Sequence, residues 1–448
     1  MKEAQVKNLL IVSIFIYCLI KSNCQSTVME KAPMGWNSWD CYGAAVDEKT
    51  VKQNAYFMAK NLAKYGWEYV VVDIQWSGPE AVNHDYIPFQ KLKMDDYGRL
   101  IPAVNRFPSS ADGAGFKPLA DYVHELGLKF GIHIMRGIPR QAAHASTPIL
   151  NSDKKASDIA QANNICAWNP DMYGVDPNND GARKYYESIF ALYAEWGVDF
   201  IKLDDICREM PKFQKELELI SDCLKNCGRE IVFSISPGPA VLEYSEVYKA
   251  TANMWRITDD FWDNWSLLYN MFERAEKWSI HTGAGNWPDA DMLPIGPLRQ
   301  DYDKSDRTKF TEDEQITMMT LWCIFRSPLM IGGEMTGFDD FTMSLLTNEE
   351  ILKMHKNSRH SHQVWRKKIN GIEHVLWTSI SSTGGQYVAV FNIGDSDSEI
   401  EISLAELEIY DENKKMKELW SGEETTASKT FKVKLYKHGA KAFLMTSS

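Results

Sequence analysis

The stretch Trp196-Gly197-Val198-Asp199-Phe200-Ile201-Lys202-Leu203-Asp204 contains the pattern that decides the fold. A long helical pattern over 182–196 precedes it, and Gly197 closes that helix because glycine enters the left-handed region at little cost. Phe200 to Asp204 then forms a short apolar run that ends in an acid, which is typical of a buried strand. This order of helix, glycine stop and strand recurs along the chain, and such repetition predicts parallel strands joined by helices.

The repeated units predict a barrel rather than an open sheet. Further strands are expected at 69–73, 129–133, 231–234, 254–256 and near 327–330, and helices at 118–126, 214–225 and 265–278. An open doubly wound sheet is the alternative, but no G-x-G-x-x-G turn follows the first strand. We therefore predict a (β/α)8 TIM barrel over residues 30–350.

A second domain is predicted over residues 360–448. Its strands are expected at 374–378, 387–392, 399–402, 430–434 and 442–444, separated by Ser, Gly and Asp turns. Short strands of this kind at close spacing predict an antiparallel β-sandwich.

The composition is that of a globular protein. Of 448 residues, 44% are hydrophobic, and the formal net charge is −12, which disfavours a nucleic-acid partner. No nicotinamide-binding motif is found, so we expect no cofactor and disfavour an oxidoreductase. The oligomeric state cannot be predicted from the sequence.

The first 24 residues have the pattern of a signal peptide. Lys2 and Lys7 precede an apolar run over 9–20, and small residues precede a cut before Gln25. About a dozen apolar residues are too few to cross a bilayer. We expect an exported mature protein without a membrane span, either periplasmic or secreted. Lipid attachment at Cys24 ranks second.

Six cysteines remain beyond that segment, and export would permit disulfides. Cys166 and Cys207 flank opposite sides of a predicted helix–strand unit and are the candidate pair. The histidines, at 281, 355, 360 and 362 among others, match no metal-ligand spacing, and no C-x-x-C pair occurs, so no metal site is predicted.

Three acids lie at or just past predicted strand ends: Asp73, Asp204 and Asp260. Barrel enzymes work at the carboxyl ends of their strands, so these acids are expected to face one mouth. Lys202 points to the same side of its strand as Asp204, because side chains alternate, and it would keep that carboxylate ionised as a nucleophile. The alternatives are helix N-caps for single acids and a structural salt bridge for the lysine.

Arg256 precedes the paired acids Asp259 and Asp260, and its guanidinium can hold a second anion or a sugar hydroxyl. An acid in an aromatic-rich pocket would suit proton donation to a leaving oxygen. The sequence leaves open which acid of the pair enters the site. Two acids on separate strand ends are what sugar cleavage by double displacement needs. Tryptophans offer flat apolar faces to a sugar ring, and two of them stand in the stretch Met34-Gly35-Trp36-Asn37-Ser38-Trp39-Asp40. Together these features predict a sugar-cleaving enzyme.

From Met34 to the C-terminus the chain resembles glycoside hydrolase family 27, the α-galactosidase and α-N-acetylgalactosaminidase group. The resemblance is carried by residues 34–39, 72–73, 127–132, 196–204, 255–265, 287–292 and 325–329. It implies a retaining mechanism, with Asp204 as nucleophile and Asp260 as acid/base. The sugar-contacting positions that it implies are Trp36, Asp73, Lys202, Arg256 and Asp291.

Three departures from the family pattern concern the sugar. Ile74 replaces the second acid of an Asp-Asp pair that holds the galactose edge carrying O4 and O6, and an apolar residue there resembles β-L-arabinopyranosidases, whose sugar lacks C6. His133 stands where a tyrosine is common. The segment containing Ser236 replaces one that often carries a glutamate near O2.

The sequence thus predicts a retaining exo-glycosidase that cleaves terminal α-D-galactosyl residues from a galactose-configured oligo- or polysaccharide. A β-L-arabinopyranosidase is the alternative. A noncatalytic carbohydrate-binding barrel is disfavoured because both acids are present.

Overall fold

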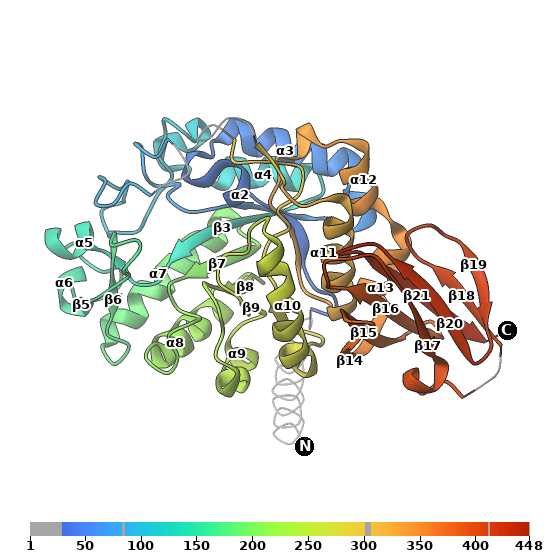
Figure 1. The fold of residues 1–448 in the computed structure, drawn as a ribbon. Helices are drawn as coiled ribbons and strands as arrows, with labels where there is room; N and C mark the ends of the chain where they lie inside the picture. Colours follow the sequence, from blue (N-terminus) through green and yellow to red (C-terminus); the bar gives the residue numbers. More distant parts are fainter. Residues whose placement is uncertain (1–28, 83–85, 301–305, 411–412, 448) are drawn as a thin grey trace, which may run out of the picture.

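The computed structural model describes residues 29–82, 86–300, 306–410 and 413–447 (Figure 1). The predicted signal peptide over residues 1–24 lies outside this part of the chain. In the described part, no helix is both long and apolar enough to cross a membrane.

Eight parallel strands curl into a barrel, which confirms the predicted fold. They are β1 (Met34–Asn37), β2 (Tyr69–Val72), β3 (Lys129–Met135), β7 (Phe200–Asp204), β8 (Val232–Ile235), β9 (Met254–Arg256), β10 (Trp287–Asp289) and β13 (Leu329–Ile331). Their order is β10-β9-β8-β7-β3-β2-β1-β13. A parallel bridge between Leu293, just after β10, and Ile331 in β13 joins the two ends.

Helices connect successive strands and cover the barrel. They are α2 (Trp39–Tyr42), α3 (Glu48–Asn61), α4 (Lys117–Glu125), α7 (Asp180–Trp196), α8 (Gln214–Lys225), α9 (Ser245–Thr251), α10 (Trp265–Trp278), α11 (Glu312–Phe325), α12 (Asp340–Thr347) and α13 (Glu349–Asn357). Helix α7 starts at the side-chain cap of Asn179 and ends at Gly197, whose φ is +83°. That φ favours glycine and explains the helix stop in the sequence.

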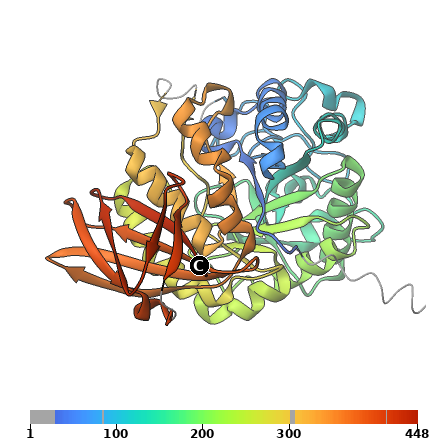
Figure 2. The same cartoon turned by 90° about the vertical axis from the view of Figure 1, so that its right-hand side faces the viewer.

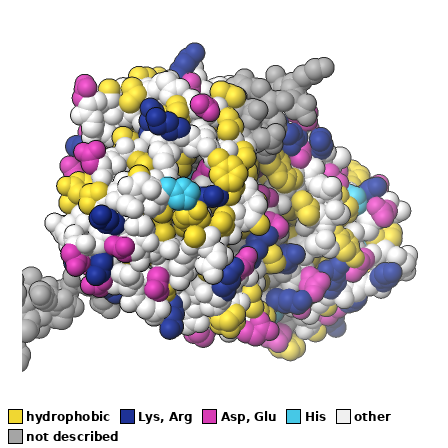
Figure 3. Space-filling view, turned by 90° about the vertical axis from the view of Figure 1, so that its left-hand side faces the viewer, with side chains coloured by type: hydrophobic (Ala, Val, Ile, Leu, Met, Phe, Trp, Pro, Cys, Tyr) yellow, Lys and Arg dark blue, Asp and Glu magenta, His cyan; other side chains and the backbone are white. Residues whose placement is uncertain are grey.

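A small lobe lies between β3 and α7 and was not predicted from the sequence. It contains β4 (Ile138–Pro139), α5 (Arg140–Ala145), α6 (Ala156–Ile159), β5 (Ala160–Ile165) and β6 (Met172–Val175). The lobe forms the left edge of Figure 1, the side that faces the viewer in Figure 3. There, hydrophobic side chains gather around the middle of the face among scattered charges. A second short pair, β11 (Pro297–Leu298) and β12 (Asp306–Arg307), lies between β10 and α11.

The C-terminal part is an antiparallel β-sandwich, as predicted. One sheet has six strands in the order β14 (Ser358–Ile369), β15 (Ile372–Ser381), β16 (Gln386–Asn392), β21 (Ala440–Ser447), β18 (Lys414–Glu418) and β19 (Glu424–Ala427). The other has β17 (Ser398–Ser403) and β20 (Thr430–Leu435). Strands β14, β18 and β19 were not predicted, because their polar and charged side chains lack clear alternation.

The central strands β15 and β16 of the six-stranded sheet are buried on both faces. Leu376 and Val388 point to the small sheet, whereas Trp377 and Phe391 point to the barrel. The ring of Phe391 packs edge-on against Phe272 of α10 with centroids 4.9 Å apart. Figure 2 shows the sandwich lying against the barrel helices. The two domains therefore share one apolar interface.

Candidate active site

Asp204 is the last residue of β7 and is held at the barrel mouth by two hydrogen bonds. One joins its Oδ2 to His133 Nε2 on β3 over 3.1 Å, and the other joins its Oδ1 to the N–H of Asp205 over 3.1 Å. Burial alone would raise the pKa of Asp204, but the bond with His133 and the nearby charges of Lys202 and Arg256 hold it well below its ordinary value. This carboxylate is therefore kept ionised.

Asp73, just past β2, forms a buried ion pair with Lys202 of β7. The lysine Nζ lies 2.9 Å from Asp73 Oδ2, and the Asn37 side chain donates to the same oxygen over 2.7 Å. Burial opposes ionisation of Asp73, but Lys202 and His133 lower its pKa below the ordinary value. The lysine thus contacts Asp73 directly and acts on Asp204 only through space.

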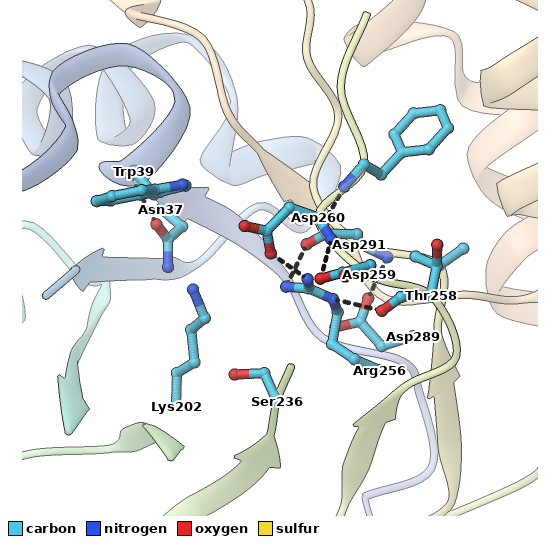
Figure 4. A network of polar contacts seen from close by, with 12 residues as sticks. Asn37, Trp39, Lys202, Ser236, Arg256, Thr258, Asp259, Asp260, Asp289 and Asp291 are labelled. Carbon is cyan, nitrogen blue, oxygen red and sulfur yellow. Dashed lines mark hydrogen bonds and ion pairs between the residues drawn. The ribbon is translucent and has the colours of Figure 1, made fainter. Parts of the chain in front are cut away.

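Arg256, at the end of β9, holds two acids with one guanidinium (Figure 4). Its Nη2 lies 2.5 Å from Asp260 Oδ1, and its Nη1 lies 2.9 Å from Asp291 Oδ1. The arginine side chain is 2% exposed, whereas that of Asp260 is 51% exposed. The fork geometry of arginine therefore anchors Asp260 while leaving it in contact with solvent.

The structure decides between the two adjacent acids. Asp260 contacts Arg256 (Figure 4), whereas Asp259 is 61% exposed and pairs with Arg208 at 2.7 Å. Aromatic side chains do lie near this acid, since the charge of Asp260 acts on Tyr86, but its direct anchor is an arginine and half of its side chain is exposed.

More acids surround Arg256 than the sequence indicated. Burial raises the pKa of Asp291 to about 7, against the opposing charge of Arg256, and Asp260 and Asp289 raise it further. Asp40 is buried as well, and its Oδ2 has no hydrogen-bond partner. Burial, followed by the charge of Asp291, raises the pKa of Asp40 well above its ordinary value. One arginine therefore faces a surplus of carboxyl groups.

The acids from separate strands converge on one aromatic ring, that of Tyr86. Its pKa is raised by burial and then by Asp204, Asp73 and Asp260, in that order. The ring stacks on Trp39 with centroids 5.2 Å apart and also contacts Trp168, whose ring is tilted, at 5.3 Å. Sequence reasoning missed Tyr86 and Trp168 because they lie in loops without a motif.

The structure does not bring Trp36 to the surface of the site. Its side chain is fully buried, and its indole N–H donates to the carbonyl of Gly333 over 2.9 Å. Trp39, three residues on, lies beside Asn37 and above Lys202 instead (Figure 4). Trp36 is therefore a barrel core residue, and Trp39 is the tryptophan of this motif that lies beside the residues of the site.

Four of the other residues that were expected to contact the sugar border a small cavity. A cavity of about 20 Å³, the size of one water molecule, is bordered by Lys202, Ser236, Arg256 and Asp291, among others. Ile74 is buried in an apolar cluster that also contains Trp39 and Met135. The residue after Asp73 therefore contributes a buried apolar side chain rather than a second carboxylate.

The expected disulfide between Cys166 and Cys207 is wrong in this structure, since both are free thiols. Each thiol has its own polar partner: Cys207 Sγ contacts the Arg256 carbonyl oxygen at 3.7 Å, and Cys166 hydrogen-bonds the Asp205 side chain. Burial raises the pKa of the Cys166 thiol to about 12.

His355 has a structural environment. His355 is buried with its Nε2 2.7 Å from the Ser327 carbonyl oxygen, and burial lowers its pKa to about 3. Among the described residues, no group of three His, Cys, Asp or Glu side chains is arranged to hold a metal ion.

Comparison with known proteins identifies the family of the chain. A family model described as "Alpha galactosidase A" matches residues 31–179 and 176–357, and one described as "Alpha galactosidase C-terminal beta sandwich domain" matches residues 371–445. The chain belongs to glycoside hydrolase family 27. It is therefore a glycoside hydrolase, with its acids at the mouth of the family's barrel.

Two solved structures and one curated relative differ in the activity they carry. A family 27 β-L-arabinopyranosidase from Geobacillus stearothermophilus is 52% identical with a TM-score of 0.90, covering 94% of this chain and 97% of its own. A putative α-N-acetylgalactosaminidase from Bacillus halodurans is 46% identical with a TM-score of 0.84, covering 94% and 99%. Alpha-galactosidase 2 from Arabidopsis thaliana is 26% identical over 84% of this chain and 78% of its own.

Proposed function

We propose that this family 27 enzyme is a retaining exo-glycosidase that prefers terminal β-L-arabinopyranosyl residues and accepts terminal α-D-galactosyl residues more slowly. In the first step, Asp204 attacks the anomeric carbon while Asp260 gives its proton to the leaving oxygen, so the glycosidic bond breaks as the glycosyl-enzyme bond forms. In the second, Asp260 takes a proton from water, and the hydroxyl group displaces Asp204.

The proposal rests on the different environments of the two carboxylates, Asp204 and Asp260. Asp204 is buried and its pKa is held low, which suits a nucleophile that must be ionised. Asp260 is fixed by Arg256 but half exposed, so it is open to the leaving oxygen in the first step and to the attacking water in the second. Two acids in unlike environments support a division of roles.

Ile74 supports the choice of sugar. It directly follows Asp73, the carboxylate expected to bind sugar hydroxyls, and its side chain is buried in a cluster with Trp39 and Met135, where a second acid would otherwise stand. A galactosyl ring would bring its hydroxymethyl group against this apolar side chain, whereas an arabinopyranosyl ring has no C6. The 52% identity to an arabinopyranosidase supports the same preference.

The catalytic roles are tested with azide. Asp204→Ala should lose turnover of both the aryl β-L-arabinopyranoside and the aryl α-D-galactoside, and added azide should yield a glycosyl azide of inverted configuration. Asp260→Ala should instead give the azide of retained configuration, because azide then attacks the glycosyl-enzyme. Wild-type rates in Asp204→Ala, or identical azide products from both variants, would contradict the roles.

The sugar preference is tested by the ratio of kcat/KM on the two aryl glycosides. Ile74→Asp should shift the ratio toward galactoside by roughly 1–3 kcal/mol, or about 5- to 150-fold, because a hydrogen-bonding carboxylate is restored. Ile74→Leu is the matched control, since it keeps an apolar side chain. A ratio that changes equally in both variants would show that the side-chain carboxylate does not set the preference.

We also propose that the protein is exported, with cleavage before Gln25. This proposal rests on the basic start and the short apolar run of the first 24 residues. N-terminal sequencing of protein recovered outside the cytoplasm would test it, and a mature chain that begins at the first methionine would contradict it.

A further inference from the structure

Asp205, the residue after Asp204, has an unusual backbone conformation. Its φ is +63°, in the left-handed region that residues with a Cβ rarely adopt. Its N–H nevertheless donates to Oδ1 of Asp204, so the direction of this strained peptide group bears on the orientation of that carboxylate. Something must hold the residue in place.

Arg136, just past β3, holds Asp205 at both ends. Its Nε donates to the Asp205 carbonyl oxygen over 2.8 Å, and its Nη2 lies 2.6 Å from the Asp205 carboxylate. Its own backbone N–H donates to the Asp204 carbonyl oxygen over 3.0 Å. A single residue therefore fixes the peptide groups on both sides of Asp205.

The Arg136 guanidinium is itself held in place by Glu216 and Phe213. Its Nη1 lies 3.0 Å from Glu216 on α8, and its plane lies over the ring of Phe213 at 3.7 Å. Tyr186 of α7 donates to the other Glu216 oxygen over 2.7 Å. The Arg136 and Glu216 side chains are 2% and 3% exposed. A planar fork held on two sides in this way has little freedom to turn.

We propose that Arg136 is a positioning residue for the nucleophile: by holding Asp205 in the left-handed region, it aims the Asp205 N–H at Asp204 and fixes the attacking carboxylate. This inference rests on Asp204 being the nucleophile. It predicts that loss of Arg136 affects the chemical step rather than sugar binding. The reason is that the guanidinium contacts Asp205, the residue after the nucleophile.

The test uses the effect of Arg136→Met in two backgrounds, both lacking the Asp205 carboxylate. In Asp205→Ala the strain at residue 205 remains, and Arg136→Met should lower kcat roughly 10- to 100-fold, with KM changing much less. In Asp205→Gly the left-handed conformation is free of strain, so the same substitution should change kcat only a few-fold. Glu216 loses its partner in both, so that cost cancels.

Equal losses of kcat in the two backgrounds would overturn the proposal, since they would indicate a purely structural arginine. A loss confined to KM would overturn it as well. If the Met variants fail to fold, Arg136→Lys keeps the charge but not the fork, and the same comparison applies. Turnover by Asp204→Ala would sink the proposed nucleophile instead, so the two failures are distinguishable.

Discussion

Replacing Lys202 by methionine should destabilise the fold, because it leaves Asp73 as a buried charge without its cation. At the 2.9 Å separation of the pair and an effective dielectric constant near 20, the attraction is about 6 kcal/mol, most of which offsets desolvation. Truncating one partner of a buried pair costs about 3–5 kcal/mol. Asn37 and the N–H of Ile74 still donate to Asp73, so we expect a loss near 3 kcal/mol.

The assay is urea unfolding at pH 7, followed by tryptophan fluorescence. Asp73→Asn removes the stranded charge, so the double variant should be more stable than the sum of the single losses predicts, by about 2 kcal/mol. The lowered pKa of Asp73 means that its ionised form stabilises the fold above pH of about 4, and this contribution is lost as the pH falls through the folded pKa. The gap between wild type and Lys202→Met should therefore shrink in acid. A loss under about 1 kcal/mol, or strict additivity, would refute the reasoning.

Four other variants probe the site and the interface. Asp260→Asn should lower kcat/KM on poor leaving groups by roughly 100-fold or more, whereas Asp259→Asn breaks only an exposed pair and should have little effect; equal losses would contradict the structure. Asp291 has a raised pKa of about 7, so its protonated form stabilises the fold in acid, and this contribution is lost as the pH rises toward 7. The stability of wild type relative to Asp291→Asn, measured as Tm, should therefore fall between pH of about 4 and 7, and a constant difference would argue against burial as the cause. Phe391→Ala should cost about 3–5 kcal/mol in urea unfolding if the sandwich packs on the barrel, and a cost under 1 kcal/mol would contradict that packing.

Much of the barrel could be predicted because its signals are local. The predicted helices over 214–225 and 265–278 have the same bounds as α8 and α10, and the predicted strands over 200–204 and 254–256 match β7 and β9. Apolar periodicity and glycine stops act within a few residues, and each is visible in the chain. The edge strand β14 carries polar side chains on both faces, so it has no such pattern.

The site was predicted only in part for a related reason. Strand ends identified Asp73 and Asp204, because the carboxyl ends of parallel strands meet at one mouth. Motif position could not distinguish Trp36 from Trp39, since only packing shows that the first is in the core. Sequence spacing likewise suggested a Cys166–Cys207 pair that the folded chain keeps as separate thiols.

The sequence alone thus determined the repeating strand–helix plan, the family resemblance and the acids available for chemistry, because these depend on residues close together along the chain. The tertiary structure decided which acid of the pair at 259 and 260 turns inward, which cation serves which carboxylate, and that Arg136 fixes the backbone after Asp204. Those contacts join residues from different strands and helices, and their directions follow from packing, which no local pattern records.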